Sequence, residues 1–203
     1  MRLVLASASP RRAELLRAAG FEFEVFAVDL DERVRDGETA SGYVERLARD
    51  KAGAGMQRFL ERAQRACRGP ERAVTDDLVV LGADTAVVIE GAILGKPRDD
   101  RDGAAMLTAL SGRRHDVMTG VCLRSASAER ARVETTSVYM SALTPEDVDW
   151  YVGSGEGRDK AGGYAVQGLA SRFVTRIEGS YTNVVGLPIA AVSTLLRELA
   201  SAG

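Results

Sequence analysis

One carboxylate and several cations, spread over distant parts of the chain, are the residues best suited to chemistry. Asp84 follows residues 78–81, an apolar run whose β-branched composition is typical of a strand buried on both faces. Ligands of open α/β sheets bind beyond the carboxyl ends of strands, where this pattern places Asp84. A charged side chain there is costly to desolvate without a partner or a task. The alternative, a turn aspartate that caps its neighbours, fits this stretch equally well.

Two arginines occupy the first turn of a predicted helix. Ser9 as N-cap and Pro10 at the first helical position predict the helix start. Arg11 and Arg12 then lie at the positive end of the helix dipole, which disfavours cations. Together with the free amides of that turn they would bind an anion, and phosphate is the obvious candidate. The alternative is that both arginines are solvated or paired with nearby carboxylates.

A lysine falls on the apolar face of the next predicted helix, which runs from about residue 41 to residue 62. The inner stripe reads Val44, Leu47, Lys51 and Ala54, a spacing of three to four residues. Lys51 either extends along the edge of this stripe to reach water or points into a site. Before this helix, Asp29, Asp31 and Glu32 form an acidic cluster, which suits a solvated turn or a divalent cation.

Two other motifs do not support the chemistry that they superficially suggest. Residues 91–97 imitate a phosphate-binding P-loop, but the spacing between glycines is one residue short and Pro97 replaces the required hydroxyl. We reject that interpretation, although Lys96 remains a suitable phosphate partner. His115 is the only histidine, which makes a histidine-based zinc cluster or a serine–histidine–aspartate triad difficult to build. We expect it to be structural.

The length of the chain fits a single domain of residues 1–203, or two lobes around a cleft. Hydrophobic residues at 45% are ample for a core, and a net charge of −2 argues against general nucleic-acid binding. Two cysteines, Cys67 and Cys122, fit a reducing compartment. The apolar run at residues 3–6 is too short for a secretory signal, and no stretch could span a bilayer. We therefore expect a cytoplasmic protein that does not bind membranes.

Strand and helix patterns alternate along the chain. Strands are predicted at residues 3–6, 21–28, 78–81, 85–89, 117–123, 133–140 and 172–177. Helices are predicted at residues 10–19, 41–62 and 99–110, and from residues 145 and 188 onward. This order predicts an α/β fold with a mixed twisted sheet flanked by helices. Residues 153–168 hold six glycines, which suits close approach by a ligand. Residues 61–77 look like a helix end and a surface loop, and we assign them no function.

The chain resembles the Maf family of nucleoside triphosphate pyrophosphatases over nearly its whole length. The matching motifs are, in order, Leu-Ala-Ser-Ala-Ser-Pro-Arg-Arg at 5–12, Gly-Ala-Asp-Thr at 82–85, Gly-Lys-Pro at 95–97, Leu-Ser-Gly at 110–112 with His115, Thr-Gly-Val at 119–121, Asp-Lys-Ala-Gly-Gly-Tyr at 159–164 with Gln-Gly at 167–168, Gly-Ser-Tyr at 179–181 and Val-Gly-Leu-Pro at 185–188. Residues 61–77 are the one visible departure, because this segment looks longer than is usual in the family.

This resemblance implies hydrolysis of a nucleoside triphosphate to the monophosphate and pyrophosphate with a divalent cation, Mg²⁺ or Mn²⁺. It also implies an α/β fold with a cleft between two lobes, often in a homodimer, and a proton-acceptor role for Asp84, which would act on water attacking the α-phosphorus. The expected site comprises Asp84, Lys51 and Lys96 as catalytic residues, Ser9, Arg11, Arg12, Thr85 and Gln167 as substrate-binding residues, and Glu32 with Asp84 as metal ligands. Asp29 or Asp31 are alternatives to Glu32.

Within the family the chain resembles the branch that hydrolyses dTTP and UTP. Arg11 and Gln167 stand where the 7-methyl-GTP branch tends to have an aromatic residue and a glutamate. A glutamine amide both donates and accepts hydrogen bonds, which matches the O4 and N3–H edge of thymine or uracil. Thr85 completes the expected specificity set. The alternative functions are a 7-methyl-GTP pyrophosphatase, a nucleotide-binding regulator of cell division and septum formation, and a nucleic-acid-binding protein using Arg11 and Arg12.

Overall fold

The computed structural model describes residues 1–66 and 77–201. Most of the segment 61–77, which the sequence distinguishes from the resembled family, and Cys67 with it, lie outside the described residues. The helices are α1 (Pro10–Ala18), α2 (Ala40–Ala66), α3 (Asp100–Leu110), α4 (Pro145–Ser154), α5 (Tyr181–Val185) and α6 (Ile189–Ala200), with short 3₁₀ turns at Ala161–Gly163 and Leu169–Arg172. The strands are β1 (Arg2–Leu5), β2 (Phe23–Val25), β3 (Leu78–Ile89), β4 (Ala92–Leu94), β5 (Arg114–Arg124), β6 (Glu129–Met140) and β7 (Val174–Glu178).

The strands of the described residues form one mixed sheet of seven strands. Its order is β2-β1-β3-β5-β6-β7, and β4 pairs with β3 outside this path. β1 is parallel to β2 and to β3, whereas β4 is antiparallel to β3 and β7 is antiparallel to β6. The predicted mixed α/β sheet flanked by helices is therefore confirmed. No helix in the described part of the chain is long and apolar enough to cross a membrane.

Residue contacts divide the chain into two compact units. Unit 1 comprises residues 1–84, 119–134 and 186–203, and unit 2 comprises residues 85–118 and 135–185. β3, β5 and β6 each contribute residues to both units. The division places Asp84 and Lys51 in unit 1, and Lys96 and Gln167 in unit 2.

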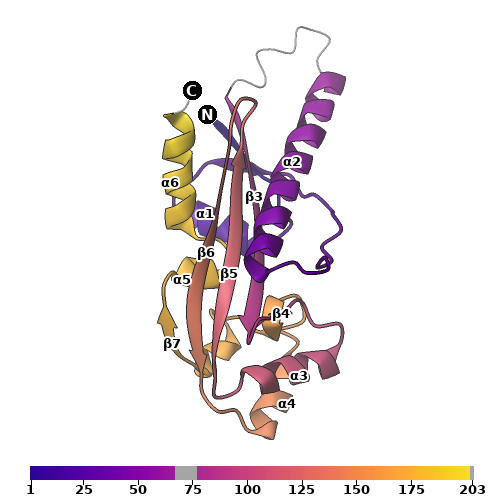
Figure 1. The fold of residues 1–203 in the computed structure, drawn as a ribbon, viewed down its shortest axis with the longest axis vertical. Coiled ribbons are helices and arrows are strands. Elements are labelled where there is room, and N and C mark those ends of the chain that lie inside the picture. Colours follow the sequence, from indigo (N-terminus) through magenta and orange to yellow (C-terminus); the bar gives the residue numbers. More distant parts are fainter. Residues whose placement is uncertain (67–76, 202–203) are drawn as a thin grey trace. The chain divides into compact units, whose positions relative to one another are not determined.

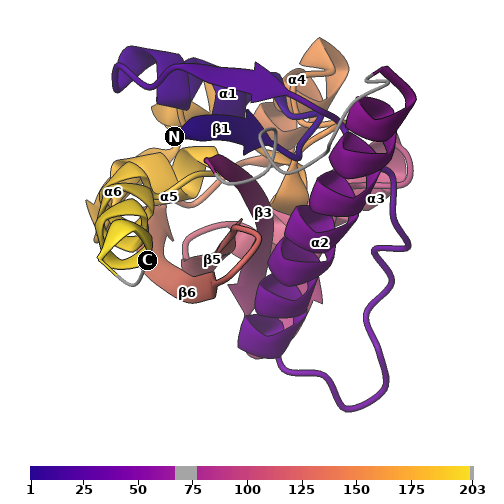
Figure 2. The same ribbon diagram turned by 90° about the horizontal axis from the view of Figure 1, so that it is seen from above.

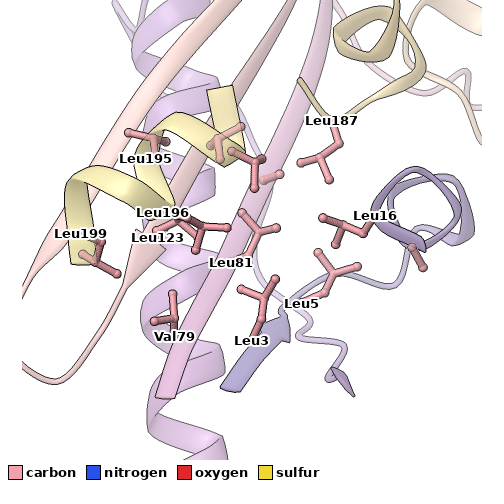
Figure 3. Close-up of a cluster of buried hydrophobic side chains, with 14 residues drawn as sticks. Leu3, Leu5, Leu16, Val79, Leu81, Leu123, Leu187, Leu195, Leu196 and Leu199 are labelled. Atoms are coloured by element: carbon pink, nitrogen blue, oxygen red, sulfur yellow. The ribbon is translucent and has the colours of Figure 1, made fainter. Parts of the chain in front are cut away.

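The core of unit 1 follows the two-residue alternation of its strands. Odd-numbered residues of β1, β3 and β5 pack with α1 and α6 in one cluster, as Figure 3 shows for Leu5, Leu81 and Leu123. Even-numbered residues such as Val4, Val80 and Cys122 point to the opposite face, where α2 packs. Figures 1 and 2 accordingly show α2 and α6 on opposite sides of the strands of unit 1. Each buried leucine or valine contributes about 1.5–3 kcal/mol.

Unit 2 has its own core, between the ends of β3, β5 and β6 and the helices α3 and α4. Leu107, Leu110 and Tyr151 are almost completely buried in it. α3 and α4 begin within one residue of the starts that the sequence predicts, whereas the short helix α5 is not predicted. Asp99 caps α3 by accepting a hydrogen bond from the amide of Asp102, and Thr144 forms a capping box with Asp147 at the start of α4.

The main departure from prediction is that β3 is one continuous strand of 12 residues. The sequence predicts two strands interrupted at Gly82 and Ala83, with Asp84 at a carboxyl end, and this prediction is wrong. Gly82 serves packing rather than interruption, because a Cβ there would lie 2.1 Å from the carbonyl oxygen of Ala48 on α2. Gly120 on β5 allows the same close approach, since its Cβ would lie 2.1 Å from the carbonyl oxygen of Val44. The α2 backbone therefore lies directly on the sheet of unit 1.

Candidate active site

Lys51 is held in the interior by the apolar face of α2. Its neighbours on the predicted stripe, Val44 and Leu47, are fully buried, and Lys51 itself is only 6% exposed. The alternative in which Lys51 reaches along the helix into water is therefore wrong. A buried ammonium requires partners, because its transfer out of water is expensive.

Asp84 supplies one of those partners. It lies within β3, is 7% exposed, and its Oδ1 accepts a hydrogen bond from Lys51 Nζ at 2.6 Å. The contact follows from the packing of α2 on Gly82, because Ala48 and Ala52, which contact this glycine, flank Lys51 in the helix. Asp84 and Lys51, two residues of the expected site, are thus in direct contact, although Asp84 lies inside the strand rather than at its end.

Glu32 supplies the second partner. Its Oε1 lies 2.6 Å from Lys51 Nζ, and its side chain is 44% exposed. Asp31, one alternative to Glu32, points instead to Arg33, whose guanidinium donates hydrogen bonds to both carboxylate oxygens at 2.6–3.0 Å and lowers the pKa of Asp31 to about 2. Asp29, the other alternative, is exposed. Glu32, Lys51 and Asp84 thus form a carboxylate–ammonium–carboxylate group with one face toward solvent.

The segment that carries Glu32 is fastened to α2 by two side chains. Tyr43 donates a hydrogen bond to the carbonyl oxygen of Glu32 at 3.0 Å. Arg46 binds the carboxylate of Glu38 with two hydrogen bonds, of 2.6 and 2.8 Å, and donates a third to the carbonyl oxygen of Arg33 at 3.2 Å. Burial and then the negative charges of Asp84 and Glu32 raise the pKa of Tyr43 to about 12. Tyr43 therefore stays protonated near pH 7 and keeps the proton that it donates to Glu32.

Arg12 is a buried anchor at the start of α1. It is 8% exposed, and it donates to the carbonyl oxygen of Gly186 at 2.9 Å and to Ser7 Oγ at 3.1 Å. Burial lowers its pKa, and the charges of Asp84 and Glu32 oppose this shift. Arg12 thus lies in the electrostatic field of the carboxylates. Its guanidinium is in part committed to the protein itself, which the prediction of a purely anion-binding arginine missed.

The other predicted residues of the α1 start occupy their expected places. Ser9 is the N-cap residue of α1, but its side chain makes no capping hydrogen bond, and its amide donates to Ser7 Oγ at 3.2 Å. Arg11 is half-buried in the first turn of the helix. This turn carries no acidic residue, so its amides and arginines together present positive charge.

Three predicted residues belong to unit 2. Thr85, half-buried, follows Asp84 directly in β3. Lys96 is exposed and follows Gly95, whose carbonyl oxygen accepts a hydrogen bond from the amide of Gly162 at 2.9 Å. Gln167 is exposed in the glycine-rich segment, between buried Val166 and half-buried Gly168. The 95–97 motif and the glycine-rich segment, which are distant in sequence, are therefore neighbours in the same unit.

The donor set of unit 1 fits a hard divalent cation. Glu32 and Asp84 already share one positive charge, the Lys51 ammonium, and carboxylate oxygens are the protein ligands that Mg²⁺ and Mn²⁺ prefer. Magnesium is commonly held by one or two carboxylates together with substrate phosphates and water. Among the described residues there is no group of three or more histidine, cysteine or carboxylate side chains suited to a metal. Glu32 and Asp84 are therefore the residues that could hold such a cation.

Sequence reasoning missed Tyr43 and Ser7 as parts of the site. Tyr43 precedes Leu47 and Lys51 by steps of four residues, which place it on the same side of the helix, so its spacing was an available signal. Ser7 belongs to the motif at residues 5–12, which by itself assigns the side chain no partner. Its role as a hydrogen-bond acceptor for Arg12 depends on how the chain turns between β1 and α1, so no local sequence pattern predicts this role.

His115 is structural, as its isolation in the sequence predicts. It is 2% exposed in unit 2, and its Nε2 lies 2.7 Å from Tyr164 Oη. Burial lowers the pKa of His115 to about 4, so the ring is neutral near pH 7.

Comparison with known proteins gives consistent results over the whole chain. A family model described as Maf-like protein matches residues 2–199. Curated relatives named dTTP/UTP pyrophosphatase include one from Anaeromyxobacter dehalogenans (strain 2CP-C), 50% identical over 97% of this chain and 93% of the relative. Others are from Vibrio vulnificus (strain YJ016), 46% identical over 97% and 98% of the two chains, and Acinetobacter baylyi, 43% identical over 96% and 98%.

A solved structure, that of the Ham1 protein of Staphylococcus aureus, aligns with a TM-score of 0.40 and 14% identity over 69% of this chain and 72% of that one. The extent of the family match and the identity to the curated relatives establish the lineage of the sequence. The chain belongs to the Maf family.

Proposed function

We propose that this protein is a nucleoside triphosphate pyrophosphatase that hydrolyses dTTP and UTP to the monophosphate and pyrophosphate. Modified pyrimidine nucleotides are further candidate substrates. The observation that carries the proposal is the buried Lys51 shared by Asp84 and Glu32. The names of relatives at 43–50% identity support the reaction and its substrates.

Asp84 is the proposed general base. Its Oδ1 accepts the hydrogen bond from Lys51, so Oδ2 is the candidate oxygen to take the proton from water attacking the α-phosphorus. Such a base typically contributes about 10²–10⁴ in rate. When bound, a divalent cation held by Glu32 and Asp84 would supply positive charge to the phosphoryl oxygens.

The cationic side chains are proposed to bind the triphosphate. A triphosphate carries about four negative charges, and each charge-assisted hydrogen bond contributes about 1.5–3 kcal/mol. In unit 1 these donors are Lys51, Arg11 and the amides at the start of α1, where Ser9 and Arg12 set the local geometry. Lys96 is the phosphate partner proposed from unit 2.

Base recognition is assigned to Gln167, with Thr85 beside the general base. Gln167 is exposed and its amide can pair with both O4 and N3–H of uracil or thymine. We propose a cytoplasmic protein that can form a homodimer and does not bind nucleic acid. The net charge of −2 supports the last point, because no overall basic field is available to attract a polyanion.

A panel of nucleoside triphosphates with Mg²⁺ or Mn²⁺, assayed separately for pyrophosphate and orthophosphate, tests the proposal. We expect pyrophosphate from UTP and dTTP. Orthophosphate alone would contradict attack at the α-phosphorus, and preference for 7-methyl-GTP would contradict the role of Gln167. Asp84→Asn should lower turnover by about 10²–10⁴ while nucleotide binding persists. Asp116→Asn, a carboxylate on β5 paired with Arg114 at 3.0 Å, is the matched control and should retain turnover.

If the protein were only a nucleotide-binding regulator of cell division, wild type and Asp84→Asn would bind the nucleotide alike and neither would release pyrophosphate.

A further inference from the structure

The exposed Gln167 is carried by a four-residue turn in unit 2. The amide of Gly168 donates to the carbonyl oxygen of Ala165 at 3.1 Å, which closes the turn around Val166 and Gln167. The residues near Gln167 are mostly buried, namely Tyr164, Ala165 and Val166 before it and Ala170 after it. The turn therefore projects the side chain of Gln167 from an otherwise packed segment.

Both sides of this turn are attached to the same pair of side chains. On one side the amide of Ala165 donates to Tyr151 Oη at 3.0 Å. On the other the amide of Leu169 donates to both carboxylate oxygens of Glu156 at 3.0 Å. Tyr151 in turn donates to Glu156 Oε2 at 2.8 Å, so the two attachments form one continuous network.

The Glu156 carboxylate also lies directly against Gly168. A Cβ at residue 168 would lie 2.0 Å from Glu156 Oε1 and 2.5 Å from its carboxyl carbon. Because φ at Gly168 is −109°, the backbone is not left-handed there, and the missing Cβ leaves the space that the Glu156 carboxylate occupies. The glycine that follows Gln167 is thus explained by Glu156.

Glu156 is aimed at the turn by the end of α4. Gly155 adopts φ 73° as the C-cap of the helix, and its amide donates to the carbonyl oxygen of Val152 at 3.0 Å. Tyr151, on the same helix, is 1% exposed, so its hydroxyl has a fixed position. Both members of the pair are therefore placed by one well-packed element.

We infer that Tyr151 and Glu156 are positioning residues for base recognition: they fix the turn that presents Gln167 to the pyrimidine. The inference rests on the proposed role of Gln167. A directional pair of hydrogen bonds to a base edge requires the glutamine backbone to be held before the substrate arrives, because ordering it during binding would cost affinity.

Competition between UTP and its N3-methyl analogue in one reaction tests the inference. The analogue has lost the N3–H that Gln167 would recognise, and the ratio of the two kcat/KM values does not depend on the fraction of active enzyme. Wild type should prefer UTP. Gln167→Ala should remove the part of this preference that the amide provides. Glu156→Ala should lower the ratio about tenfold, equivalent to about 1.4 kcal/mol.

Two further variants distinguish positioning from simple loss of stability. Glu156→Gln keeps a carbonyl oxygen that can accept from Leu169, so it should restore part of the preference. Tyr151→Phe removes the acceptor for the Ala165 amide and should lower the ratio. Tyr139→Phe is the matched control, because Tyr139 donates to Glu178 at 2.7 Å elsewhere in unit 2, and it should leave the ratio unchanged.

The outcomes separate the two proposals. If Gln167→Ala lowers the preference for UTP but Glu156→Ala and Tyr151→Phe do not, the positioning role is wrong and the role of Gln167 stands. If Gln167→Ala leaves the preference unchanged, or UTP is not hydrolysed, both proposals are overturned.

Discussion

Lys51 occupies the position that a metal ion would need, which leads to an unusual prediction. Its ammonium lies 2.6 Å from Glu32 and 2.6 Å from Asp84, the two carboxylates proposed to hold the cation. A divalent ion must therefore displace the ammonium or bind against its charge. We predict that Lys51→Met binds Mn²⁺ more tightly than wild type, although its turnover is lower.

The size of the effect follows from the charges involved. Two unit charges 4 Å apart interact by about 4 kcal/mol at an effective dielectric constant near 20, and a divalent ion doubles this. The full value is an upper limit, because Lys51 can rotate away and Glu32 is 44% exposed to water. If only a sixth to a third of this upper limit is expressed, about 1.4–2.8 kcal/mol, the affinity rises about 10- to 100-fold.

Electron paramagnetic resonance of free Mn²⁺, measured without nucleotide, reports this affinity directly. Arg49→Met is the matched control, because Arg49 lies two residues earlier on α2 and pairs with Glu45 and Glu129 at a more exposed position. It should bind Mn²⁺ as wild type does. Melting temperature gives a second measurement. Without Lys51 the two carboxylates lack their shared cation, so Mn²⁺ should raise the melting temperature of Lys51→Met more than that of wild type.

Unchanged or weaker Mn²⁺ binding by folded Lys51→Met would refute the reasoning. Lys51 and the metal would then not compete for the same oxygens, and the assignment of Glu32 and Asp84 as ligands would fail. Circular dichroism of each variant establishes that the compared proteins are folded.

Three further predictions concern stability. Burial lowers the pKa of His115 to about 4, below its ordinary value of 6.5, so between these pH values the unfolded state binds more protons than the folded state. The free energy of unfolding should therefore fall by up to about 3 kcal/mol as the pH drops from 6.5 to 4. Urea unfolding of His115→Gln should show a shallower pH dependence, and a profile identical to that of wild type would contradict this. Gly82→Ala should destabilise the folded protein by about 1–3 kcal/mol or prevent folding, because the new Cβ would meet the α2 backbone. Gly153→Ala is the contrasting variant: it lies in α4, its Cβ would have no atom within 4 Å, and it should stabilise the protein by about 0.5–1 kcal/mol in thermal unfolding. Arg12→Lys should lower the free energy of unfolding by about 1–3 kcal/mol, because an ammonium cannot reproduce the two guanidinium hydrogen bonds to Gly186 and Ser7. An unchanged free energy of unfolding would show that these hydrogen bonds do not contribute to stability.

Local patterns predicted most elements because the responsible interactions are local. The helix starts at Pro10, Asp100 and Pro145 follow from capping residues and proline, which act on the backbone within one turn. The fold class follows from the alternation of such elements. Boundaries that depend on pairing were less accurate: β2 is shorter than predicted, and β5 and β6 are longer. A strand extends only as far as its partners do.

The candidate site was predicted as a set of residues, but the relations among them were not. The helical period alone placed Lys51 on a buried face. It could not show that Glu32 and Asp84 share its ammonium, nor that Arg12 binds Gly186, 174 residues away. Such pairings depend on the path of the whole chain.

Residue types at short, regular spacing were enough to establish the family motifs, the α/β class and the place of Lys51 on an apolar helix face. The three-dimensional fold was needed to show that Asp84 lies inside a continuous strand and that Gly82 serves close packing. A glycine looks the same in a sequence whether the chain breaks there or a helix backbone packs against it. Only the position of α2 distinguishes the two.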